Sequence, residues 1–280
     1  MGADCFKIIS RNWICKKMKV SVVTINYNNR YGLENTIKSV LSQDFSCLEY
    51  LVIDGGSTDG SMEIIKKYQE RISYWVSEPD HGIYNAMNKA IQKATGEYLL
   101  FLNSGDYFCS SHVLSDVFAT RQDADLLVGR QKFVGGNGKA GVSPKLHVEE
   151  INMEYFISST LPHQATFIKG ALFSNCGLYD ESYRVCADWV FWIQAVVKHH
   201  CTLEILPMAV SYMDNGGVSS NMDRCHQDMS RYLQVCLNDG TLTWNDILSV
   251  AQKGRIQDIC SRSKLLMFTN KILAWIGRKV

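Results

Sequence analysis

Two short segments decide the fold expected from this sequence, and each joins a run of apolar residues to an aspartate. They are Tyr50-Leu-Val-Ile-Asp-Gly-Gly-Ser-Thr-Asp-Gly-Ser61 and Tyr98-Leu-Leu-Phe-Leu-Asn-Ser-Gly-Asp106. An apolar run that breaks directly into small polar residues is typical of a buried parallel strand. Ligands of open α/β sheets bind beyond the carboxyl ends of the strands, so Asp54 and Asp106 are candidates to line one site. Either aspartate could also simply cap the following helix.

Strand and helix patterns alternate around these segments. Short runs of branched apolar residues predict strands, and apolar residues spaced three and four apart predict helices. The predicted strands cover residues 20–25, 50–53, 72–76, 98–102 and 125–129, and the predicted helices cover residues 33–41, 64–68, 83–94 and 113–118. Residues 135–138, Gly-Gly-Asn-Gly, predict a hairpin-like turn. Strand, helix and strand in this order form a βαβ unit, so an α/β fold is expected.

Composition narrows the class of protein. The 280 residues are 46% hydrophobic and 20% charged, enough apolar material for one large domain or two small ones. The net charge of +1 gives no electrostatic basis for nucleic-acid binding, so no nucleic-acid partner is expected. The ten cysteines include no Cys-x-x-Cys pair, which disfavours a zinc site and a compact disulfide framework. Reduced thiols in a cytosolic protein are the plain interpretation.

Neither a membrane span nor a secretion signal is expected. No apolar run approaches the ~18 residues of a transmembrane helix. Residues 1–17 are interpreted as an N-terminal extension without the apolar core of a signal peptide, with Met18 as an alternative start. The expected location is therefore the cytoplasm.

Four segments, taken in order, resemble the nucleotide-sugar-binding half of a family 2 glycosyltransferase. They are residues 20–28, Asp54-Gly-Gly-Ser-Thr-Asp-Gly-Ser61, Glu78-Pro-Asp-His-Gly-Ile-Tyr-Asn-Ala-Met-Asn-Lys89 and Thr95-Gly-Glu-Tyr-Leu-Leu-Phe-Leu-Asn-Ser-Gly-Asp106. Each motif is weak alone, but the ordered series is specific, and with later motifs the similarity covers about residues 18–220. The resemblance implies a GT-A fold, in which a Rossmann-like nucleotide-binding half with a mixed sheet (18–110) precedes an acceptor-binding half (111–220) and C-terminal helices (221–280).

The resemblance also assigns roles on the donor side. It implies that Tyr27, Asp54 and Asp80 lie at the base or ribose of a nucleotide-sugar, and that Asn103 and Ser104 line the same site. Gly55 and Gly56 could admit a phosphate or a base close to the backbone, or only serve the turn. The segment after Asp54 has neither the dinucleotide nor the P-loop fingerprint.

Asp106 is the implied ligand of a divalent metal, Mn²⁺ or Mg²⁺, on the donor diphosphate. The family's metal motif is Asp-x-Asp, whereas this chain has Ser104-Gly105-Asp106. These cations commonly use one or two carboxylates together with substrate phosphates and water, so a single aspartate could still anchor the ion. Metal dependence is therefore expected, although the departure keeps a non-catalytic nucleotide-sugar-binding scaffold open.

Two later motifs supply the remaining candidates. His163-Gln164 resembles the family's His-Gln element beside the diphosphate or acceptor, although an isolated histidine is more often structural. Asp188, in Ala187-Asp188-Trp189, resembles the general base, and the alternative is an acid favoured at a helix start by the macrodipole. Trp189 and Trp192 could pack in the core or stack on a sugar ring.

These parts suit transfer of a sugar. A metal and positive donors neutralise charge on the leaving diphosphate, and a carboxylate removes the proton of an acceptor hydroxyl. If Asp188 deprotonates the acceptor, displacement is direct and the anomeric configuration inverts. We therefore expect an inverting glycosyltransferase that uses a UDP-sugar in polysaccharide or glycolipid assembly; the rival enzyme is a nucleotidyltransferase on a related α/β scaffold.

The C-terminal segment predicts an amphipathic helix. Between residues 264 and 279 the apolar side chains form one broad face, and Lys264, Lys271 and Arg278 recur along its flank. Such basic helices lie on anionic membrane surfaces, although docking on the protein's own body is the commoner outcome. Contact with the inner face of the cell membrane would suit a lipid-linked acceptor.

Overall fold

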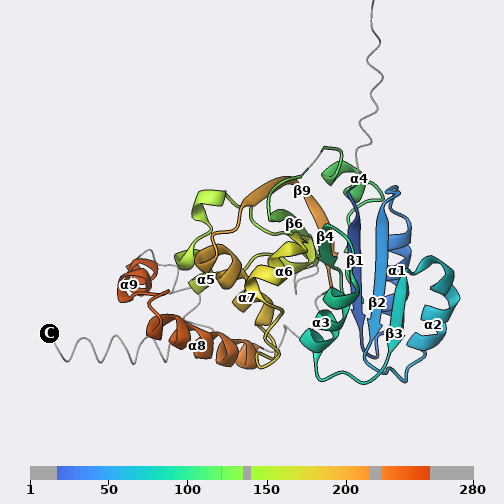
Figure 1. Cartoon of the computed structure of the whole chain (residues 1–280), viewed down its shortest axis with the longest axis horizontal. Helices are drawn as coiled ribbons and strands as arrows, with labels where there is room; N and C mark the ends of the chain where they lie inside the picture. Colours follow the sequence, from blue (N-terminus) through green and yellow to red (C-terminus); the bar gives the residue numbers. More distant parts are fainter. Residues whose placement is uncertain (1–17, 121, 135–139, 215–221, 253–280) are drawn as a thin grey trace, which may run out of the picture.

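One mixed sheet runs through the molecule. The computed structural model describes residues 18–120, 122–134, 140–214 and 222–252. Within these ranges the strands follow the order β3-β2-β1-β4-β8-β6-β9-β5, and β7 pairs with β6 outside this path. Figure 1 shows β1 to β3 with α1 and α2 at one end of the molecule and the last helices, α8 and α9, at the other.

The first half of the sheet is parallel, as the sequence predicted. Its strands are β1 (Val20–Asn26), β2 (Leu48–Asp54), β3 (Tyr74–Ser77) and β4 (Tyr98–Phe101). Asn26 lies opposite Asp54, and Asp54 lies opposite Ser77, so the polar carboxyl ends of three strands share one edge. All seven residues of β1 are buried, including the polar Ser21, Thr24 and Asn26, so the strand does not alternate between a buried and an exposed face.

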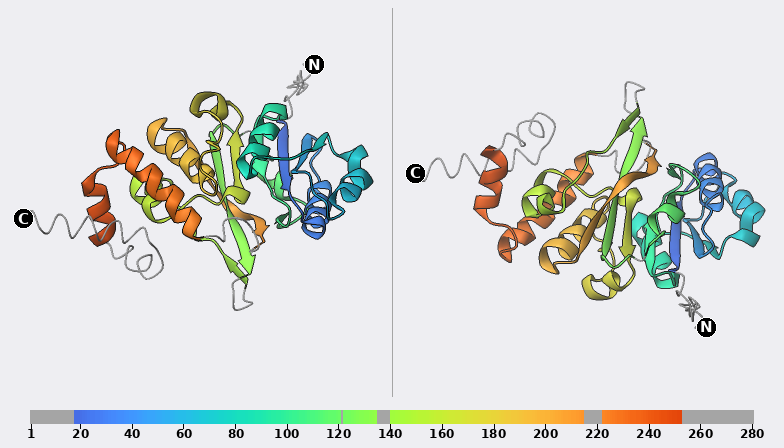
Figure 2. Two further views of the ribbon diagram at one scale, coloured as in Figure 1. Left: turned by 90° about the horizontal axis from the view of Figure 1, so that it is seen from below. Right: turned by 90° about the horizontal axis from the view of Figure 1, so that it is seen from above.

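Helices cover both faces of this half, as the views in Figures 1 and 2 show. They are α1 (Arg30–Leu41), α2 (Ser61–Tyr68), which leads into the turn η1 (Gln69–Arg71), and α3 (Ile83–Lys93). Leu33 of α1 and Ile65 of α2 pack with Val22 and Val52 on one face, whereas Met87 of α3 packs on the other. The side chains of successive strand residues point to opposite faces of the sheet and therefore pack into two separate cores.

The second half is mixed. It contains β5 (Tyr107–Phe108), α4 (Val113–Val117), β6 (Leu126–Val134), β7 (Ala140–Val142), η2 (Val148–Glu150), α5 (Met153–Ser158), η3 (His163–Ala165), β8 (Thr166–Lys169), α6 (Ala171–Cys176), α7 (Ala187–Trp192), η4 (Ile193–Lys198), β9 (Leu203–Met213), α8 (Met222–Asn238) and α9 (Trp244–Gln252). The strand β8 runs antiparallel to both β4 and β6, and therefore joins the two halves into one sheet. The structure confirms the expected α/β class with a mixed sheet and C-terminal helices.

Most predicted elements are confirmed, with shifted ends. The third strand begins at Tyr74 instead of residue 72, because Ile72 follows η1 and is buried there before the chain enters the sheet. The strand predicted at 125–129 extends to Val134, since β6 continues beside β9 past two shifts of register. The 135–138 turn lies outside the described residues, although the strands on either side of it, β6 and β7, pair antiparallel. The 1–17 extension and the 264–279 helix also lie outside them.

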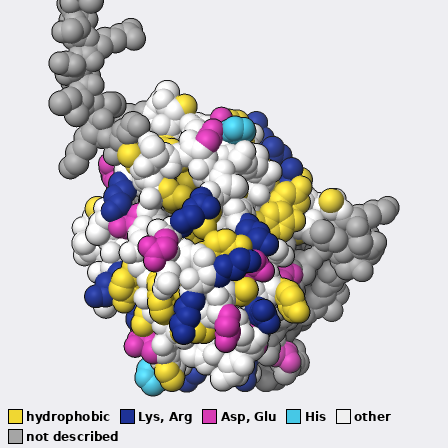
Figure 3. Space-filling model, turned by 90° about the vertical axis from the view of Figure 1, so that its right-hand side faces the viewer, with side chains coloured by type: hydrophobic (Ala, Val, Ile, Leu, Met, Phe, Trp, Pro, Cys, Tyr) yellow, Lys and Arg dark blue, Asp and Glu magenta, His cyan; other side chains and the backbone are white. Residues whose placement is uncertain are grey.

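Charges of both signs are interspersed on the surface over α1 and α2. Figure 3 views the molecule from this side. Glu34 of α1 pairs with Lys38 of the same helix and with Lys67 of α2. In the part of the chain that the structure describes, no helix combines the length and apolarity needed to cross a membrane.

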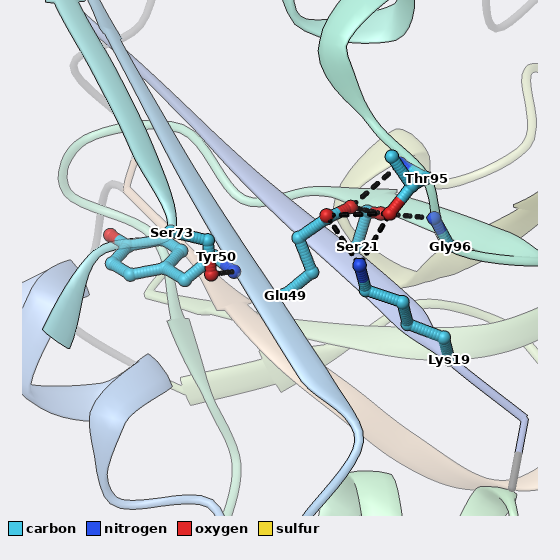
Figure 4. A network of polar contacts seen from close by, with 7 residues as sticks. All are labelled: Lys19, Ser21, Glu49, Tyr50, Ser73, Thr95 and Gly96. Carbon is cyan, nitrogen blue, oxygen red and sulfur yellow. Dashed lines mark hydrogen bonds and ion pairs between the residues drawn. The ribbon is translucent and has the colours of Figure 1, made fainter.

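A buried carboxylate fastens the end of the sheet that lies opposite the polar strand exits. Glu49 accepts hydrogen bonds from Lys19 Nζ (2.6 Å), Ser21 Oγ (2.5 Å) and Thr95 N (2.7 Å), which connects β1, β2 and the turn before β4 (Figure 4). Burial alone would raise the pKa of Glu49, but these donors outweigh it and hold the pKa at about 2. Because the ordinary value is 4.5, the stabilisation is complete above that pH and is lost as the pH falls toward 2.

Glu49→Gln should lower the free energy of unfolding by about 2 kcal/mol at neutral pH, because a charged acceptor of several bonds is lost. Its difference from the unmodified chain should shrink as the pH falls below 4.5. Urea unfolding at several pH values measures both effects, with Glu63→Gln on the exposed side of α2 as the control. An equal loss at pH 7 and pH 3 would contradict this account.

Candidate functional site

The carboxyl ends of β1, β2 and β3 meet at Asp54. This side chain is fully buried and accepts bonds from Asn26 Nδ2 (2.7 Å), Ser57 N (2.9 Å), Ser57 Oγ (2.5 Å) and Ser77 Oγ (2.5 Å). Four donors occupy the lone-pair sites of an ionised carboxylate. Asp54 therefore fixes the turn from Gly55 to Ser57 against the two neighbouring strands.

Tyr27 and Asp80 meet beside this turn. A Cβ atom built on Gly55 would lie 3.1 Å from Asp80 Oδ2 and 3.2 Å from the Tyr27 ring. Asp80 accepts a hydrogen bond of 2.6 Å from Lys89. Tyr27, in contrast, is 67% exposed to solvent. The structure thus gathers three predicted donor-side residues, Tyr27, Asp54 and Asp80, around one glycine.

The loop of residues 103–106 is held against the start of α1. Ser104 N donates to Ile25 O (3.0 Å), and Asn29 Nδ2 donates to Ser104 O (3.0 Å). Thr36 Oγ1 donates to Asp106 O (2.6 Å). These bonds bring Asn103, Ser104 and Asp106 to the exit of β4, next to the exit of β1.

Asp106 is a buried carboxylate with few compensating contacts. It is 4% exposed, Asp214 N donates to its Oδ1 (2.8 Å), and the Gln164 side chain also hydrogen-bonds to it. Burial raises the pKa of Asp106 to about 7, the two hydrogen bonds oppose this, and the nearby charge of Asp214 adds to it. The ionised form is therefore costly unless positive charge is present.

Asp214 brings a second carboxylate to the same place. Its Oδ2 lies 2.7 Å from the position of a Cβ on Gly105, whose φ is +106°. Asn103 Oδ1 is buried without a hydrogen-bond partner among the described residues. Carboxylate and amide oxygens are the ligands that Mg²⁺ and Mn²⁺ prefer, so this donor set fits such an ion. No cluster of three or more His, Cys, Asp or Glu side chains suited to a metal occurs in the described ranges, so phosphate and water oxygens would have to complete the coordination.

Asp188 lies in the first turn of α7 and is half-buried. Its Oδ1 is 2.7 Å from the hydroxyl of Tyr84 on α3, which also lies 2.6 Å from Val185 O. Burial raises the pKa of Tyr84 well above its ordinary value, and the adjacent Asp188 raises it further, so the phenol keeps its proton as a donor. This bond orients the Asp188 carboxylate across the two halves.

The turn η3 connects the surroundings of Asp188 to those of Asp106. The His163 ring stacks on Phe101 with centroids 5.1 Å apart, and its Nε2 lies 3.0 Å from the Tyr179 hydroxyl. Burial lowers the pKa of His163 although the charge of Asp188 opposes this, so the imidazole is neutral at pH 7. The next residue, Gln164, contacts Asp106. Neighbouring residues of one three-residue turn therefore interact with the two carboxylates, His163 with the charge of Asp188 and Gln164 with Asp106.

Both tryptophans of α7 belong to the core. Trp189 is 2% exposed and donates from Nε1 to Phe156 O (2.9 Å), and Trp192 is fully buried. Packing, not sugar stacking, is therefore the role the structure shows. The acidic candidate Asp188 is the residue of this motif that faces outward.

The predicted donor-side residues lie at the carboxyl ends of the parallel strands, where Asp54 and Asp106 are buried and Tyr27 is exposed. Two surface hollows, of about 300 and about 530 Å³, lie elsewhere: one borders Gly96 and Lys169, and the other borders His199 and Cys201. Neither is lined by a predicted site residue. The strand topology and the hydrogen bonds, and not concavity, identify the candidate site.

No role was predicted for Tyr84, and Asp214 was expected only at the start of a loop, residues 214–219, that resembles a family segment near the acceptor site. Tyr84 falls inside the segment Glu78–Lys89, and Asp214 begins the Asp-Asn-Gly-Gly-Val-Ser segment, of which residues 215–219 lie outside the described residues. The sequence offers one indication of such a contact: Gly105 has no side chain, so it leaves room for a carboxylate from elsewhere in the chain, which the structure shows to be Asp214.

The profile of the family described as "Glycosyl transferase family 2" matches residues 21–177. The chain belongs to this family. A glycosyltransferase of Mycobacterium tuberculosis is 31% identical over 212 residues, which cover 73% of this chain and 78% of that protein. A PGL/p-HBAD biosynthesis glycosyltransferase of Mycobacterium bovis is 28% identical over 209 residues, 72% and 79% of the two chains. The chain is thus a glycosyltransferase.

Solved structures share the fold. TarS of Staphylococcus aureus, in complex with UDP, superposes with a TM-score of 0.61 at 22% identity over 76% of this chain and 64% of that one. The mannosyltransferase PcManGT of Pyrobaculum calidifontis, in complex with GDP-Man and Mn²⁺, gives 0.60 at 17% identity over 92% and 81%. At these identities the likeness establishes the GT-A fold of this family 2 chain and confirms the expected fold class.

Gly105→Ala should lower the free energy of unfolding by about 2 to 5 kcal/mol. Two costs add up: alanine is strained at a positive φ, and its methyl group would clash with the Asp214 side chain. Gly240→Ala is the matched control, since Gly240 has φ +79° but nothing within 4 Å of the added atom. The control should cost only about 1 to 2 kcal/mol in urea unfolding followed by circular dichroism. Equal losses in the two variants would mean that Asp214 does not occupy this position.

Proposed function

We propose that this family 2 chain is an inverting glycosyltransferase that moves a sugar from a UDP-sugar to an acceptor hydroxyl. The observation that carries the proposal is the half-buried Asp188, oriented by Tyr84 and separated by one turn from Asp106. The printed names of relatives support an acceptor in glycolipid or surface-polysaccharide assembly: one acts in PGL/p-HBAD biosynthesis, and TarS is a poly(ribitol-phosphate) β-N-acetylglucosaminyltransferase. TarS matches over only 33% of its own length.

The donor nucleoside would lie beside the Gly55 turn. The open Tyr27 ring offers a stacking surface for the base, and Asp80 offers a carboxylate for base or ribose groups. Asp54, whose oxygens are occupied, shapes the turn that receives the nucleoside. Asn103 and Ser104 lead from this position to the diphosphate.

The diphosphate would lie at Asp106. We assign a Mn²⁺ or Mg²⁺ ion to Asp106 and Asp214, which when bound supplies positive charge to the leaving diphosphate. Asp214 supplies the second carboxylate that Ser104 lacks. Gln164 orients Asp106, and the neutral His163, enclosed by Phe101 and Tyr179, holds Gln164 in place.

Asp188 would remove the proton from the acceptor. Its Oδ1 is oriented by Tyr84, which leaves Oδ2 to accept the acceptor's hydroxyl proton as that oxygen attacks the anomeric carbon. The attack comes from the side opposite the diphosphate, so the configuration inverts. The diphosphate leaves with the bonding electrons, and no covalent sugar on the protein is needed.

Asp188→Asn should reduce transfer by roughly 10²- to 10⁴-fold, because the base is lost, while the donor Kd stays within about twofold. Tyr84→Phe removes only the orienting hydroxyl and should reduce kcat by about tenfold. Both are measured by release of UDP from a UDP-sugar with and without added acceptor, and by donor titration calorimetry. Unchanged turnover in Asp188→Asn would remove Asp188 from its role, and release of pyrophosphate from a nucleoside triphosphate would favour a nucleotidyltransferase instead.

Mn²⁺ with UDP should raise the Tm of the protein by roughly 5 to 10 °C at a hundredfold excess over Kd, and Asp106→Asn should abolish this rise. Without ligands, the same variant should be more stable than the unmodified chain at pH 8, since the raised pKa of Asp106 makes its charge destabilising above about pH 7.

Differential scanning fluorimetry with and without chelator measures both effects, with Asp116→Asn on the exposed side of α4 as the control. Asp214→Asn should weaken the metal-dependent rise without removing it. A rise that is independent of both aspartates would contradict the assigned ion site.

A further inference from the structure

Cys186 and Cys225 bring their sulfur atoms within 2.6 Å of one another. Cys186 immediately precedes α7, which carries Asp188, and is buried, whereas Cys225 lies on α8 and is partly exposed. A disulfide bond is about 2.05 Å long, so the two sulfurs need to approach by only about half an ångström to form one. Nothing in the proposed transfer reaction uses either thiol.

The surrounding contacts hold the two cysteines in this arrangement. Val185 N donates to Asp228 Oδ2 of α8 (2.8 Å), and the Arg231 guanidinium lies 3.9 Å from the centre of the Tyr183 ring. Two residues just before Cys186 are thus held against α8, which packs beside α7 (Figure 1). The packing of this segment against α8 therefore brings the two sulfurs together.

We propose that Cys186 and Cys225 form a redox-active dithiol that a hydroperoxide closes to a disulfide, which covalently ties the start of the Asp188 helix to α8. The cysteine pair is thus a site of reversible oxidation. A small peroxide is the oxidant, and a small dithiol is the reductant for the reverse step. The proposal does not depend on the identity of the sugar donor.

The chemistry balances with one peroxide per bond. The Cys225 thiolate attacks one oxygen of hydrogen peroxide, so an S–O bond forms, the O–O bond breaks, and the departing hydroxide takes up a proton to become water. Cys186, after losing its proton, then attacks Sγ of Cys225, so the S–S bond forms and the S–O bond breaks with loss of a second water. Two thiols are oxidised and one peroxide is reduced.

Cys225 is suited to react first. It is the more accessible of the two, and the hydrogen bond from Cys186 lowers the pKa of the Cys225 thiol despite the opposing effect of burial. Cys186 is buried directly beside it and suits the second, resolving step.

Peptide mapping tests the bond directly. The full chain, reduced with dithiothreitol and desalted, is treated with hydrogen peroxide and digested with trypsin without reductant. Trypsin yields residues 185–198 and 225–231, each with one cysteine, and mass spectrometry should find these two peptides linked. Separate peptides with Cys225 as a sulfinic acid, or Cys225 linked to a different cysteine, would overturn the proposal.

Thermal melting tests the consequence. Oxidation should raise the Tm by roughly 5 to 10 °C, and dithiothreitol should reverse the rise. Cys225→Ser should melt at the same temperature with and without peroxide. The control is Cys109→Ser, which replaces a half-buried cysteine distant in sequence from both Cys186 and Cys225, and it should retain the full rise in Tm. If Cys186→Ser fails to fold, the Cys225→Ser variant, which changes a partly exposed residue, and the peptide map still test the proposal. Linked peptides together with an unchanged Tm would refute the proposed tie between α7 and α8.

Discussion

The candidate site depends on one buried charge, the Asp106 carboxylate. It ends the segment after β4 and accepts a hydrogen bond from the backbone N–H of Asp214, 108 residues later, at the end of β9. Burial makes its ionised form costly, and hydrogen bonds at the Asp214 backbone, the Gln164 side chain and the Asn103 backbone offset only part of that cost. A carboxylate that is only partly compensated in this way is stabilised by a nearby cation, which agrees with the ion proposed for this site.

The rest of the fold keeps this charge in place from two directions. The parallel strands β1 and β2 pair in a register that brings Asn26 opposite Asp54 at the site, while Glu49 fastens the opposite end of the sheet. Tyr84 of α3 in the first half donates a hydrogen bond to Asp188 of α7 in the second half, 104 residues later in the sequence. The parallel half of the sheet therefore positions both the proposed donor side and, through Tyr84, the proposed base.

Much of this arrangement could be predicted from local sequence pattern. Buried parallel strands have a continuous apolar signature, so the ends of β1, β2 and β4, and with them Asp54 and Asp106, were placed at one edge of the sheet in advance. The resemblance to the family added Asp188. The start of β3 was misjudged because Ile72 is apolar but serves a turn instead of the sheet.

What could not be predicted depends on contacts between distant segments. No periodicity places β9 beside β5, so the proximity of Asp214 to Gly105 is visible only in three dimensions. The same holds for Tyr84, which lies on a helix with an ordinary apolar face, and for Cys186 and Cys225, whose spacing matches no short cysteine motif. The alternatives for Trp189 and Trp192 also required the structure, because a tryptophan suits a core and a sugar equally well.

Asp106 and Asp188 are proposed to serve one reaction centre. Anomalous diffraction from crystals of the protein with UDP and Mn²⁺ tests it most directly. The account predicts a manganese peak roughly 2.1 Å from an Asp106 carboxylate oxygen, with the free oxygen of Asp188 facing the terminal phosphate. A peak bound to other residues, or an Asp188 carboxylate turned away from the nucleotide, would contradict it.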